Sequence, residues 1–127
     1  MNPFSIFKKK KTVIPLEQRY RVTFDKVRVE CTLPDGRKES VEWADLKAIL
    51  LENTDEGPFL PDVFWILVGE KSGCLIPQGA IGAMELLTEM QKLPGFDNNA
   101  VIESAVCTDN KKFLCWERSR IDSEVIN

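Results

Sequence analysis

The sequence predicts an α+β domain built on an antiparallel, curved or barrel-like β-sheet, with two short helices near the C-terminus. Apolar and polar residues alternate in short runs over the first two thirds of the chain, as half-buried strands require. Helical spacing of apolar residues begins only after Gly82. Strands and helices do not alternate as they do in the units that build a parallel sheet, which leaves an antiparallel arrangement.

The length of the chain indicates one domain. Its 127 residues, 43% of them hydrophobic, can form one core but are too few for two domains of usual size. We predict a flexible arm over residues 1–16, a single domain over 17–118 and a frayed tail over 119–127. The longest apolar stretch lies near Val63–Val68 and is far shorter than the roughly 20 residues of a membrane-spanning helix, so we expect no transmembrane segment.

Three strands are predicted in the first third of the chain. They cover Tyr20–Asp25, Val27–Thr32 and Ser40–Trp43, and Pro34–Gly36 supplies the turn between the second and the third. The alternation places these residues inward: Tyr20, Val22, Phe24, Val27, Val29, Cys31, Val41 and Trp43.

The middle of the chain predicts a tight helical turn followed by further strands. The alternation breaks at Ala44–Leu46 and resumes at Ala48–Leu51, and the polar residues 53–58 form a loop. Val63–Val68 is apolar on both faces, which predicts the central and best-covered strand. Gly73–Pro77 is its expected hairpin partner.

Two helices and a last strand complete the predicted fold. The first helix follows Gly82 and ends at Pro94, and the second begins after Asp97, a typical N-cap residue. Phe96 is placed to pack on Val101 as a hydrophobic staple, and Phe113–Trp116 is the closing strand. The expected apolar stripes are Met84, Leu87, Met90 and Leu93, with Leu86 beside them, on the first helix, and Val101, Ile102 and Ala105 on the second.

The residue types present argue against most catalytic chemistry. The chain has no His, which removes the commonest general base and the commonest zinc ligand. Its four cysteines, at positions 31, 74, 107 and 115, form no Cys-x-x-Cys pair, and three fall among apolar neighbours in predicted strands. We therefore expect buried free thiols, a cytoplasmic protein, and neither a metal nor another cofactor.

Charge divides the chain into a basic arm and an acidic body. The net charge is −3, although the arm carries Lys8, Lys9, Lys10 and Lys11. An acidic body repels the phosphates of nucleic acids, so we expect no nucleic acid as a ligand. It attracts basic proteins, so we expect a protein partner, and charge favours a basic one. The four lysines, beside Phe4, Ile6 and Phe7, are the candidate contact with a membrane surface or an anion. The sequence does not decide whether the chain forms a homo-oligomer.

Two loops carry the remaining candidate residues. Asp55, Glu56 and Asp62 surround Phe59 in one loop, where they could bind a basic partner, form a solvated turn, act as paired carboxylates or hold a hard cation. The turn Gly79–Gly82 could present backbone amides to an anion, although it lacks the spacing of a phosphate-binding loop.

Several motifs resemble those of a family of small, uncharacterised bacterial cytosolic proteins. They are Asp62–Trp65, Cys74–Gln78 and Leu93–Asn98, together with Trp43–Leu46 and Phe113–Trp116. The expected sheet is also similar to pleckstrin-homology-like domains, except that a strand follows the helices. The resemblance implies no activity, cofactor or catalytic residue.

The sequence therefore favours a non-enzymatic protein-binding module. Small acidic bacterial proteins of this kind include toxin-neutralising immunity proteins, which makes that role one form of the hypothesis. A domain that binds a small molecule or a lipid headgroup is the alternative, and a small enzyme that uses carboxylates is the third hypothesis.

Overall fold

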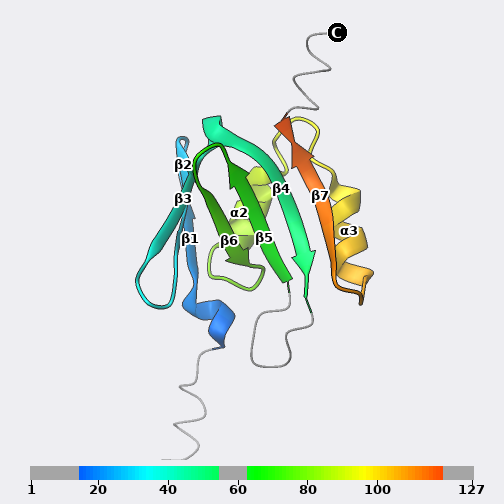
Figure 1. Cartoon of the computed structure of the whole chain (residues 1–127), viewed down its shortest axis with the longest axis horizontal. Coiled ribbons are helices and arrows are strands. Elements are labelled where there is room, and N and C mark those ends of the chain that lie inside the picture. Colours follow the sequence, from blue (N-terminus) through cyan, green and yellow to red (C-terminus); the bar gives the residue numbers. More distant parts are fainter. Residues whose placement is uncertain (1–14, 55–62, 119–127) are drawn as a thin grey trace, which may run out of the picture.

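The computed structural model describes residues 15–54 and 63–118, in which the strands form two antiparallel sheets. The first sheet has the order β1-β2-β3, and the second has the order β6-β5-β4-β7 (Figure 1). These findings confirm the α+β class and the antiparallel pairing, and the described strands form no closed barrel. The strands are β1 (Arg21–Phe24), β2 (Arg28–Thr32), β3 (Lys38–Glu42), β4 (Leu46–Asn53), β5 (Val63–Gly69), β6 (Gly73–Pro77) and β7 (Lys111–Glu117).

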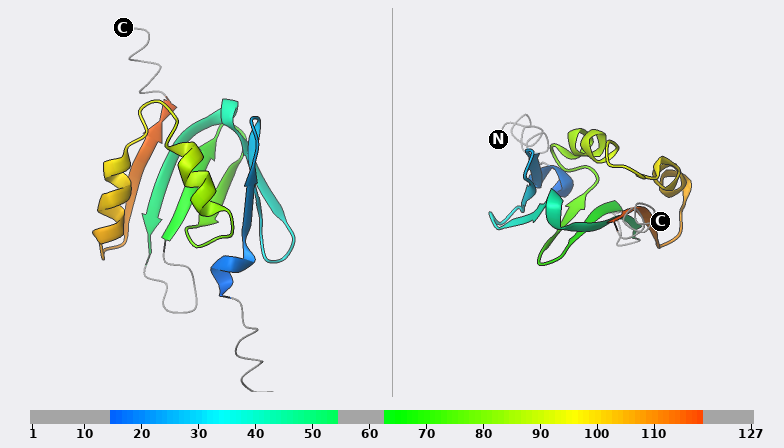
Figure 2. Two further views of the ribbon diagram at one scale, coloured as in Figure 1. Left: turned by 180° about the vertical axis from the view of Figure 1, so that it is seen from behind. Right: turned by 90° about the horizontal axis from the view of Figure 1, so that it is seen from above.

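Both α-helices lie on one side of the four-stranded sheet. These helices are α2 (Ala83–Met90) and α3 (Asn98–Val106), and two short 3-10 helices, η1 (Leu16–Arg19) and η2 (Trp43–Asp45), precede β1 and β4. Helix α2 packs against β1, whereas α3 packs against β7 and β4 (Figure 2). Figure 1 shows the opposite face of the sheet toward the viewer, with the helices behind it.

The core is built on the helical side of this sheet. Ile76, Trp65, Leu51 and Phe113 lie directly opposite one another on the four neighbouring strands, and all four side chains are buried. Residues in direct register point to the same face of an antiparallel sheet, so this row covers the full width of the sheet with apolar side chains. The helices and the three-stranded sheet complete the core around it.

The two sheets meet where β3 lies beside β6. The backbone amide of Leu75 donates to Oε1 of Glu39 at 2.9 Å, and the Ser72 hydroxyl donates to the carbonyl oxygen of Ser40 at 2.7 Å. At the end of β5, a Cβ on Gly69 would lie 2.6 Å from Cγ2 of Val41. Glycine at this position therefore allows the second sheet to approach the first closely.

The outer edge of β1 is paired with the turn that leads into α2. The amide of Val22 donates to the carbonyl oxygen of Ile81 at 2.7 Å, and the amide of Ile81 donates to that of Tyr20 at 3.0 Å. Gly82 follows with φ of 93°, a left-handed conformation that glycine adopts at little cost. This turn fixes the start of α2 against the three-stranded sheet.

The Asp97 cap is confirmed, and the predicted helical stripes are correct in part, since Met90 is buried and Leu87, Leu93 and Val101 pack against the core. Oδ1 of Asp97 accepts from the amides of Asn99 at 2.9 Å and Ala100 at 3.2 Å. Met84 is 72% exposed and Ile102 is 62% exposed. The prediction is wrong at Met84, Ile102 and Ala105, which face solvent, and small residues let α3 lie close to the strands. The residues buried on the two helices are Ala83, Leu86 and Met90 on α2, and Ala100 and Ser104 on α3.

Two inward positions predicted on the first strands also differ. Val27 is exposed because it lies in the β1–β2 turn, where its amide donates to Oδ1 of Asp25 at 2.8 Å. Trp43 is only partly buried and belongs to η2, and its Nε1 donates to the carbonyl oxygen of Asp25 at 2.8 Å. The helical turn predicted at Ala44–Leu46 is thus present one residue earlier in the chain.

Candidate functional site

Two of the three candidate sites that the sequence singles out lie outside the described parts of the chain. This holds for the partner-binding loop of Asp55, Glu56, Phe59 and Asp62, and equally for the basic arm. Both assignments stay predictions. The basic residues concerned are Lys8, Lys9, Lys10 and Lys11.

The turn Gly79–Gly82 is described, and its amides are largely engaged within the protein. The amide of Gly79 donates to Oε2 of Glu17 at 2.8 Å, and that of Ala80 donates to the carbonyl oxygen of Pro77 at 3.0 Å. The amide of Ile81 is bonded to Tyr20. Because a carboxylate already accepts from this turn, the turn is poorly suited to bind a second anion.

An unexpected surface lies on the outer face of the four-stranded sheet. Leu75 on β6 is in direct register with Ile66 on β5, Ile66 with Leu50 on β4, and Leu50 with Leu114 on β7. These four residues alternate along their strands with the buried row, so they point away from the helices. We call them the outer row; it crosses the full width of the sheet.

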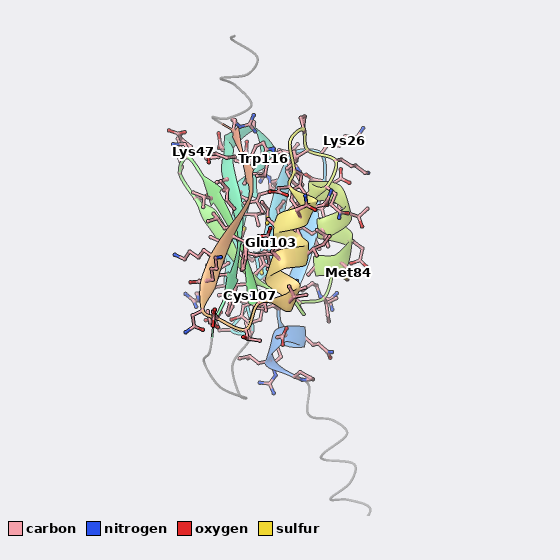
Figure 3. All side chains as sticks on the ribbon, turned by 90° about the vertical axis from the view of Figure 1, so that its right-hand side faces the viewer. Lys26, Lys47, Met84, Glu103, Cys107 and Trp116 are labelled. Carbon is pink, nitrogen blue, oxygen red and sulfur yellow. The ribbon has the colours of Figure 1, made fainter. Side chains whose placement is uncertain are left out.

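The outer row is open to solvent on the described structure. Leu75 is 45% exposed, Leu114 is 38% exposed, and Val68, the next outward residue on β5, is also 38% exposed. Leu50 and Ile66 are partly buried between them. No described helix or strand covers this face, which Figure 1 shows from the front. Figure 3 shows the sheet edge-on, with Lys47 on the side of the outer face and Met84 on the side of the helices.

The exposed face corrects the prediction for Val63–Val68. This segment is paired on both edges, with β4 and with β6, as a central strand should be. Its second apolar face, however, is not covered by any described element. The sequence carried the signal, since Phe64, Ile66 and Val68 are all apolar. This apolar pattern predicts burial on both faces of the strand, because the pattern by itself does not distinguish a covered face from an exposed binding face.

A bulge in β7 determines which of its residues reach the outer face. The register shifts between the pairs Ile49–Trp116 and Leu50–Leu114, so Cys115 is the extra residue of β7. Cys115 and Trp116 are consequently both buried. The outward residues of β7 are therefore Lys112, Leu114 and Glu117.

The bulge is held by the link between the two helices. The amide of Asp97 donates to the carbonyl oxygen of Cys115 at 2.7 Å, and Nε1 of Trp116 donates to that of Pro94 at 2.8 Å. Because the α2–α3 link accepts and donates at two successive residues of β7, it fixes the position of the shift.

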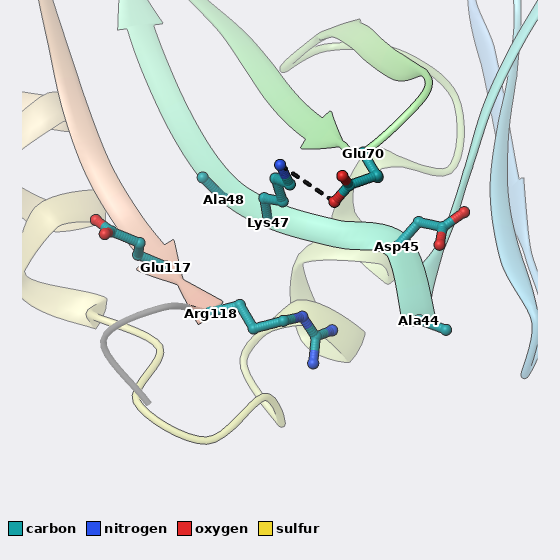
Figure 4. Close-up of a pocket in the computed structure, with 7 residues that line it drawn as sticks. All are labelled: Ala44, Asp45, Lys47, Ala48, Glu70, Glu117 and Arg118. Carbon is teal, nitrogen blue, oxygen red and sulfur yellow. Dashed lines mark ion pairs between the residues drawn. The ribbon is translucent and has the colours of Figure 1, made fainter. Parts of the chain in front are cut away.

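A polar groove of about 590 Å³ adjoins one end of the outer face. It shares Ala48 with that face, since Ala48 lies in register between Val68 and Glu117. Nζ of Lys47 lies 3.1 Å from Oε2 of Glu70 across the groove (Figure 4). The charged residues that line the groove are Asp45, Lys47, Glu70, Glu117 and Arg118.

Arg118 joins the segments that meet at this end of the sheet. Its Nε donates to the carbonyl oxygen of Leu46 at 2.7 Å, and its Nη2 donates to that of Trp43 at 2.8 Å. The guanidinium also lies over the Trp116 ring, 5.2 Å from its centre. With its hydrogen bonds directed to backbone carbonyls, Arg118 acts as a structural clamp between η2, β4 and β7.

The cysteines are structural. Cys31, Cys74 and Cys115 are buried free thiols, as the sequence predicts, and Cys107 is partly buried. Burial raises the pKa of Cys31 and Cys115 to about 11 and that of Cys74 to about 12. These three thiols stay protonated at neutral pH and are poor nucleophiles.

The described residues contain neither a metal-binding cluster nor a membrane-spanning helix. No group of three or more His, Cys, Asp and Glu residues within 15–54 and 63–118 is arranged to hold a metal ion. None of the helices in the same ranges combines the length and the apolar character needed to cross a membrane.

Comparison with known proteins gives no relative for this chain. No protein-family model matches it, and neither a curated protein nor a solved structure is significantly similar to it. The resemblance to a bacterial family and to pleckstrin-homology-like domains therefore stays a prediction.

Proposed function

We propose that this chain is a protein-binding module and that its binding surface is the outer face of the four-stranded sheet. The observation that carries the proposal is the outer row, which places an apolar side chain on every strand of a face that no described element covers. Contiguous exposed apolar surface is uncommon on soluble proteins and marks sites of association.

The surroundings of the row support a protein as the partner. Charged residues lie at the edges of the apolar row, with Glu52 and Lys112 on one side and the polar groove on the other. An apolar centre with a polar rim is the usual anatomy of a protein–protein interface. A small molecule would be held better by a concave site that encloses it, which the outer face of a sheet does not supply.

The energies involved are sufficient for specific binding. Full burial of one Leu or Ile side chain contributes about 1.5–3 kcal/mol. The residues of the outer row are already partly covered by one another, so each contributes a fraction of that amount. Four of them, with Val68 and Phe64, would still provide the apolar centre of an interface.

The test uses charges placed on the outer row. Leu75→Glu and Leu114→Glu are combined in one variant, and Met84→Glu is the matched control, because Met84 is an exposed apolar residue on the helical side. Tagged proteins are used to capture partners from an extract of the source organism, and binding of each recovered protein is then measured by calorimetry. We expect the double variant to lose about tenfold or more in affinity and the control to bind like the wild type.

The fold of each variant is checked by circular dichroism and thermal unfolding. Both substituted positions on the sheet are exposed, so the unfolding temperature should change little. Wild-type affinity in the folded double variant would contradict the proposal.

A toxin-neutralising role would be one form of this function. The described rim carries charges of both signs, so it does not by itself select a basic partner. Selection of a basic partner by Asp55, Glu56, Phe59 and Asp62 stays a prediction.

A further inference from the structure

The outer edge of β7 carries unpaired backbone groups, and we infer that it binds an extended segment of a partner protein as an additional antiparallel strand. β7 stands at the end of the order β6-β5-β4-β7, so it is paired along one edge, with β4. An extended peptide can add to a free strand edge through main-chain hydrogen bonds. The inference goes beyond the proposed function, because it concerns the edge of the sheet and stands whether or not the outer face binds a partner.

The other edges of the two described sheets are engaged within the protein. The edge of β1 pairs with Ile81, and the amide of Leu75 on β6 donates to Glu39 of β3, where the sheets meet. On β7 the α2–α3 link reaches the edge at one point, where the amide of Asp97 donates to the carbonyl oxygen of Cys115. The edge before Cys115 is free of described contacts of this kind.

The register shows which backbone groups of the sheet point to which neighbour. Successive residues of a strand direct their amide and carbonyl groups to opposite edges. On β5 the amide of Gly69 donates to the carbonyl oxygen of Ser72, toward β6, so Ile66, three residues earlier, bonds toward β4. Ile66 lies opposite Leu50. Leu50 therefore bonds toward β5, and its neighbour Leu51 bonds toward β7.

The same alternation assigns the groups of β7. Leu51 lies opposite Phe113, so Phe113 bonds to β4, and its neighbours Lys112 and Leu114 direct their amides and carbonyls away from the sheet. No described residue forms a hydrogen bond with any of these four groups. We call this stretch, Lys112–Leu114, the open edge. An antiparallel strand would pair with both residues and form four backbone hydrogen bonds over a segment of three residues.

The surroundings of the open edge can accept a strand. Figure 3 looks at this edge and shows β7 beside α3, with no described helix or strand in front of it. α3 lies on the helical side of the sheet and extends sideways past β7 (Figures 1 and 2). An added strand, about 4.8 Å from β7, would therefore be covered by α3 on its helical side and would continue the outer face on its other side.

The side chains at the open edge define the chemistry of the added strand. Lys112 and Leu114 are both exposed on the outer face, and no described acidic residue forms an ion pair with Lys112. Cross-strand neighbours of opposite charge, and apolar neighbours, stabilise a sheet. An antiparallel strand passes Leu114 first, so it would carry an apolar residue there and an acidic residue two positions later, opposite Lys112.

The acidic residues of the protein do not oppose this placement. Glu52 lies in register with Lys112 but on β4, so β7 separates it from the added strand. Glu103 lies on α3, on the helical side, where Figure 3 labels it. A negative charge on the outer side of the added strand is therefore nearest to Lys112.

The experiment uses the full chain, isotope-labelled for NMR, and the blocked peptide Thr-Val-Thr-Glu-Thr. A segment this short should bind with a dissociation constant in the millimolar range. At four times that concentration, solvent exchange of the amides of Lys112 and Leu114 should slow about fivefold. The amide of Phe113, which is bonded to β4 already, should be unaffected.

Methylated peptides distinguish strand addition from contact through side chains. Methylation of the backbone nitrogens of Val and Glu in the peptide removes the two donors that face β7, and it should weaken binding about tenfold or more. Methylation of the central Thr nitrogen, which points away from β7, leaves those donors in place, and this peptide should bind like the parent. The protein itself is unchanged in this comparison, so its folding is not a variable.

Charge reversal tests the register. Lys112→Glu should weaken binding of the parent peptide about threefold or more, and the same variant should prefer a peptide in which Lys replaces Glu. Lys26→Glu, on the β1–β2 turn away from β7, is the matched control and should bind like the wild type. Leu75→Glu, on β6 at the other side of the sheet, should also leave peptide binding unchanged.

Two results would overturn the inference. One is unchanged exchange at Lys112 and Leu114 up to about 10 mM peptide, and the other is equal binding of both methylated peptides. If either occurs while the Leu75→Glu, Leu114→Glu variant still loses a captured protein, the open edge is excluded and the outer face stands as the binding surface. If the peptides behave as expected while that variant captures like the wild type, the outer face is excluded and the open edge stands.

Discussion

The side-chain amide of Asn53 donates a hydrogen bond to the carbonyl oxygen of Ser104 at 2.9 Å and joins the end of β4 to the last turn of α3. The same nitrogen reaches the carbonyl oxygen of Cys107 at 3.2 Å. The carbonyl oxygen of Ser104 also accepts from the amide of Cys107 at 3.4 Å, so Asn53 adds a second and shorter bond there and also bonds the carbonyl oxygen of Cys107, the C-cap residue of α3. It thereby holds α3 on the helical side of the sheet, opposite the outer row.

Replacing Asn53 should therefore destabilise the protein. Asn53→Ala removes the donor of both hydrogen bonds, so we expect the free energy of unfolding to fall by about 1–3 kcal/mol. Asn53→Asp keeps the size of the side chain but replaces its donor with a carboxylate, and it should cost at least as much. Urea unfolding followed by fluorescence measures both. An Asn53→Ala protein with the wild-type midpoint would show that the bond contributes nothing.

Gly82 should resist substitution more strongly than a glycine with the same backbone conformation elsewhere. Gly82→Ala imposes a side chain at φ of 93° and places its Cβ against the carbonyl oxygen of Val22. Gly36 has φ of 91° but no atom within 4 Å of its Cβ position, so Gly36→Ala measures the cost of conformation alone.

We expect a loss of about 1–2 kcal/mol for Gly36→Ala and a larger loss for Gly82→Ala. Thermal and urea unfolding provide the comparison. Equal losses would mean that the turn at Ile81 shifts to accommodate the added Cβ and does not fix the start of α2.

Arg118 should not be replaceable by another cation. Its two nitrogens donate to carbonyl oxygens of Leu46 and Trp43, which the single ammonium of a lysine cannot reach in the same geometry. Arg118→Lys should lower the free energy of unfolding by about 1–3 kcal/mol, and Arg118→Ala should lower it further. Lys112→Ala, on the strand β7 that precedes Arg118, is the control, with little expected change. A fully stable Arg118→Lys protein would show that charge alone, and not the two bonds, matters at this position.

Stability should decrease in alkaline solution because of the buried thiols. Burial raises the pKa of Cys31 and Cys115 to about 11 and of Cys74 to about 12 in the folded protein, from an ordinary value of 9.0. Above pH 9 the unfolded chain loses these protons while the folded protein retains them. The free energy of unfolding therefore falls as the pH rises from about 9 to 12, and the contribution is fully present below pH 9.

A triple Cys→Ala variant at these positions separates the thiols from other groups that titrate in this range. Urea unfolding between pH 8 and about 10.5 should show a shallower decrease for the variant than for the wild type. Parallel pH profiles for the two proteins would assign the alkaline loss to other groups.

The elements that the sequence predicts well are those determined by neighbouring residues. The alternation in Tyr20–Asp25, the hairpin partner at Gly73–Pro77 and the cap at Asp97 are all present in the structure, because each depends on side chains a few positions apart. The burial of three cysteines follows in the same way from their apolar neighbours.

Helical faces and the outer surface were predicted less well. Two stripes with helical period were available on α2, and the position of the helix between β1 and the sheet decides that Leu86 and not Met84 is buried. The first candidate site falls in the loop 55–62, outside the described residues, whereas the outer row combines residues from four strands. Residues so far apart in the chain have no common local signal.

The sequence by itself determined the α+β class, the antiparallel hairpins, the helix cap and the structural character of the thiols, since local conformational preference and apolar spacing suffice for these. Only the tertiary structure decided that β7 pairs with β4 over residues 58 to 69 positions apart, from Asn53–Lys111 to Ala48–Glu117, that a bulge at Cys115 turns Trp116 inward, and that both helices cover the same face. An apolar side chain lowers the free energy of any state that removes it from water. The pattern on Ile66 and Leu114 is therefore the same whether a helix of the chain or a second molecule covers them, and only the placement of α2 and α3 distinguishes the two.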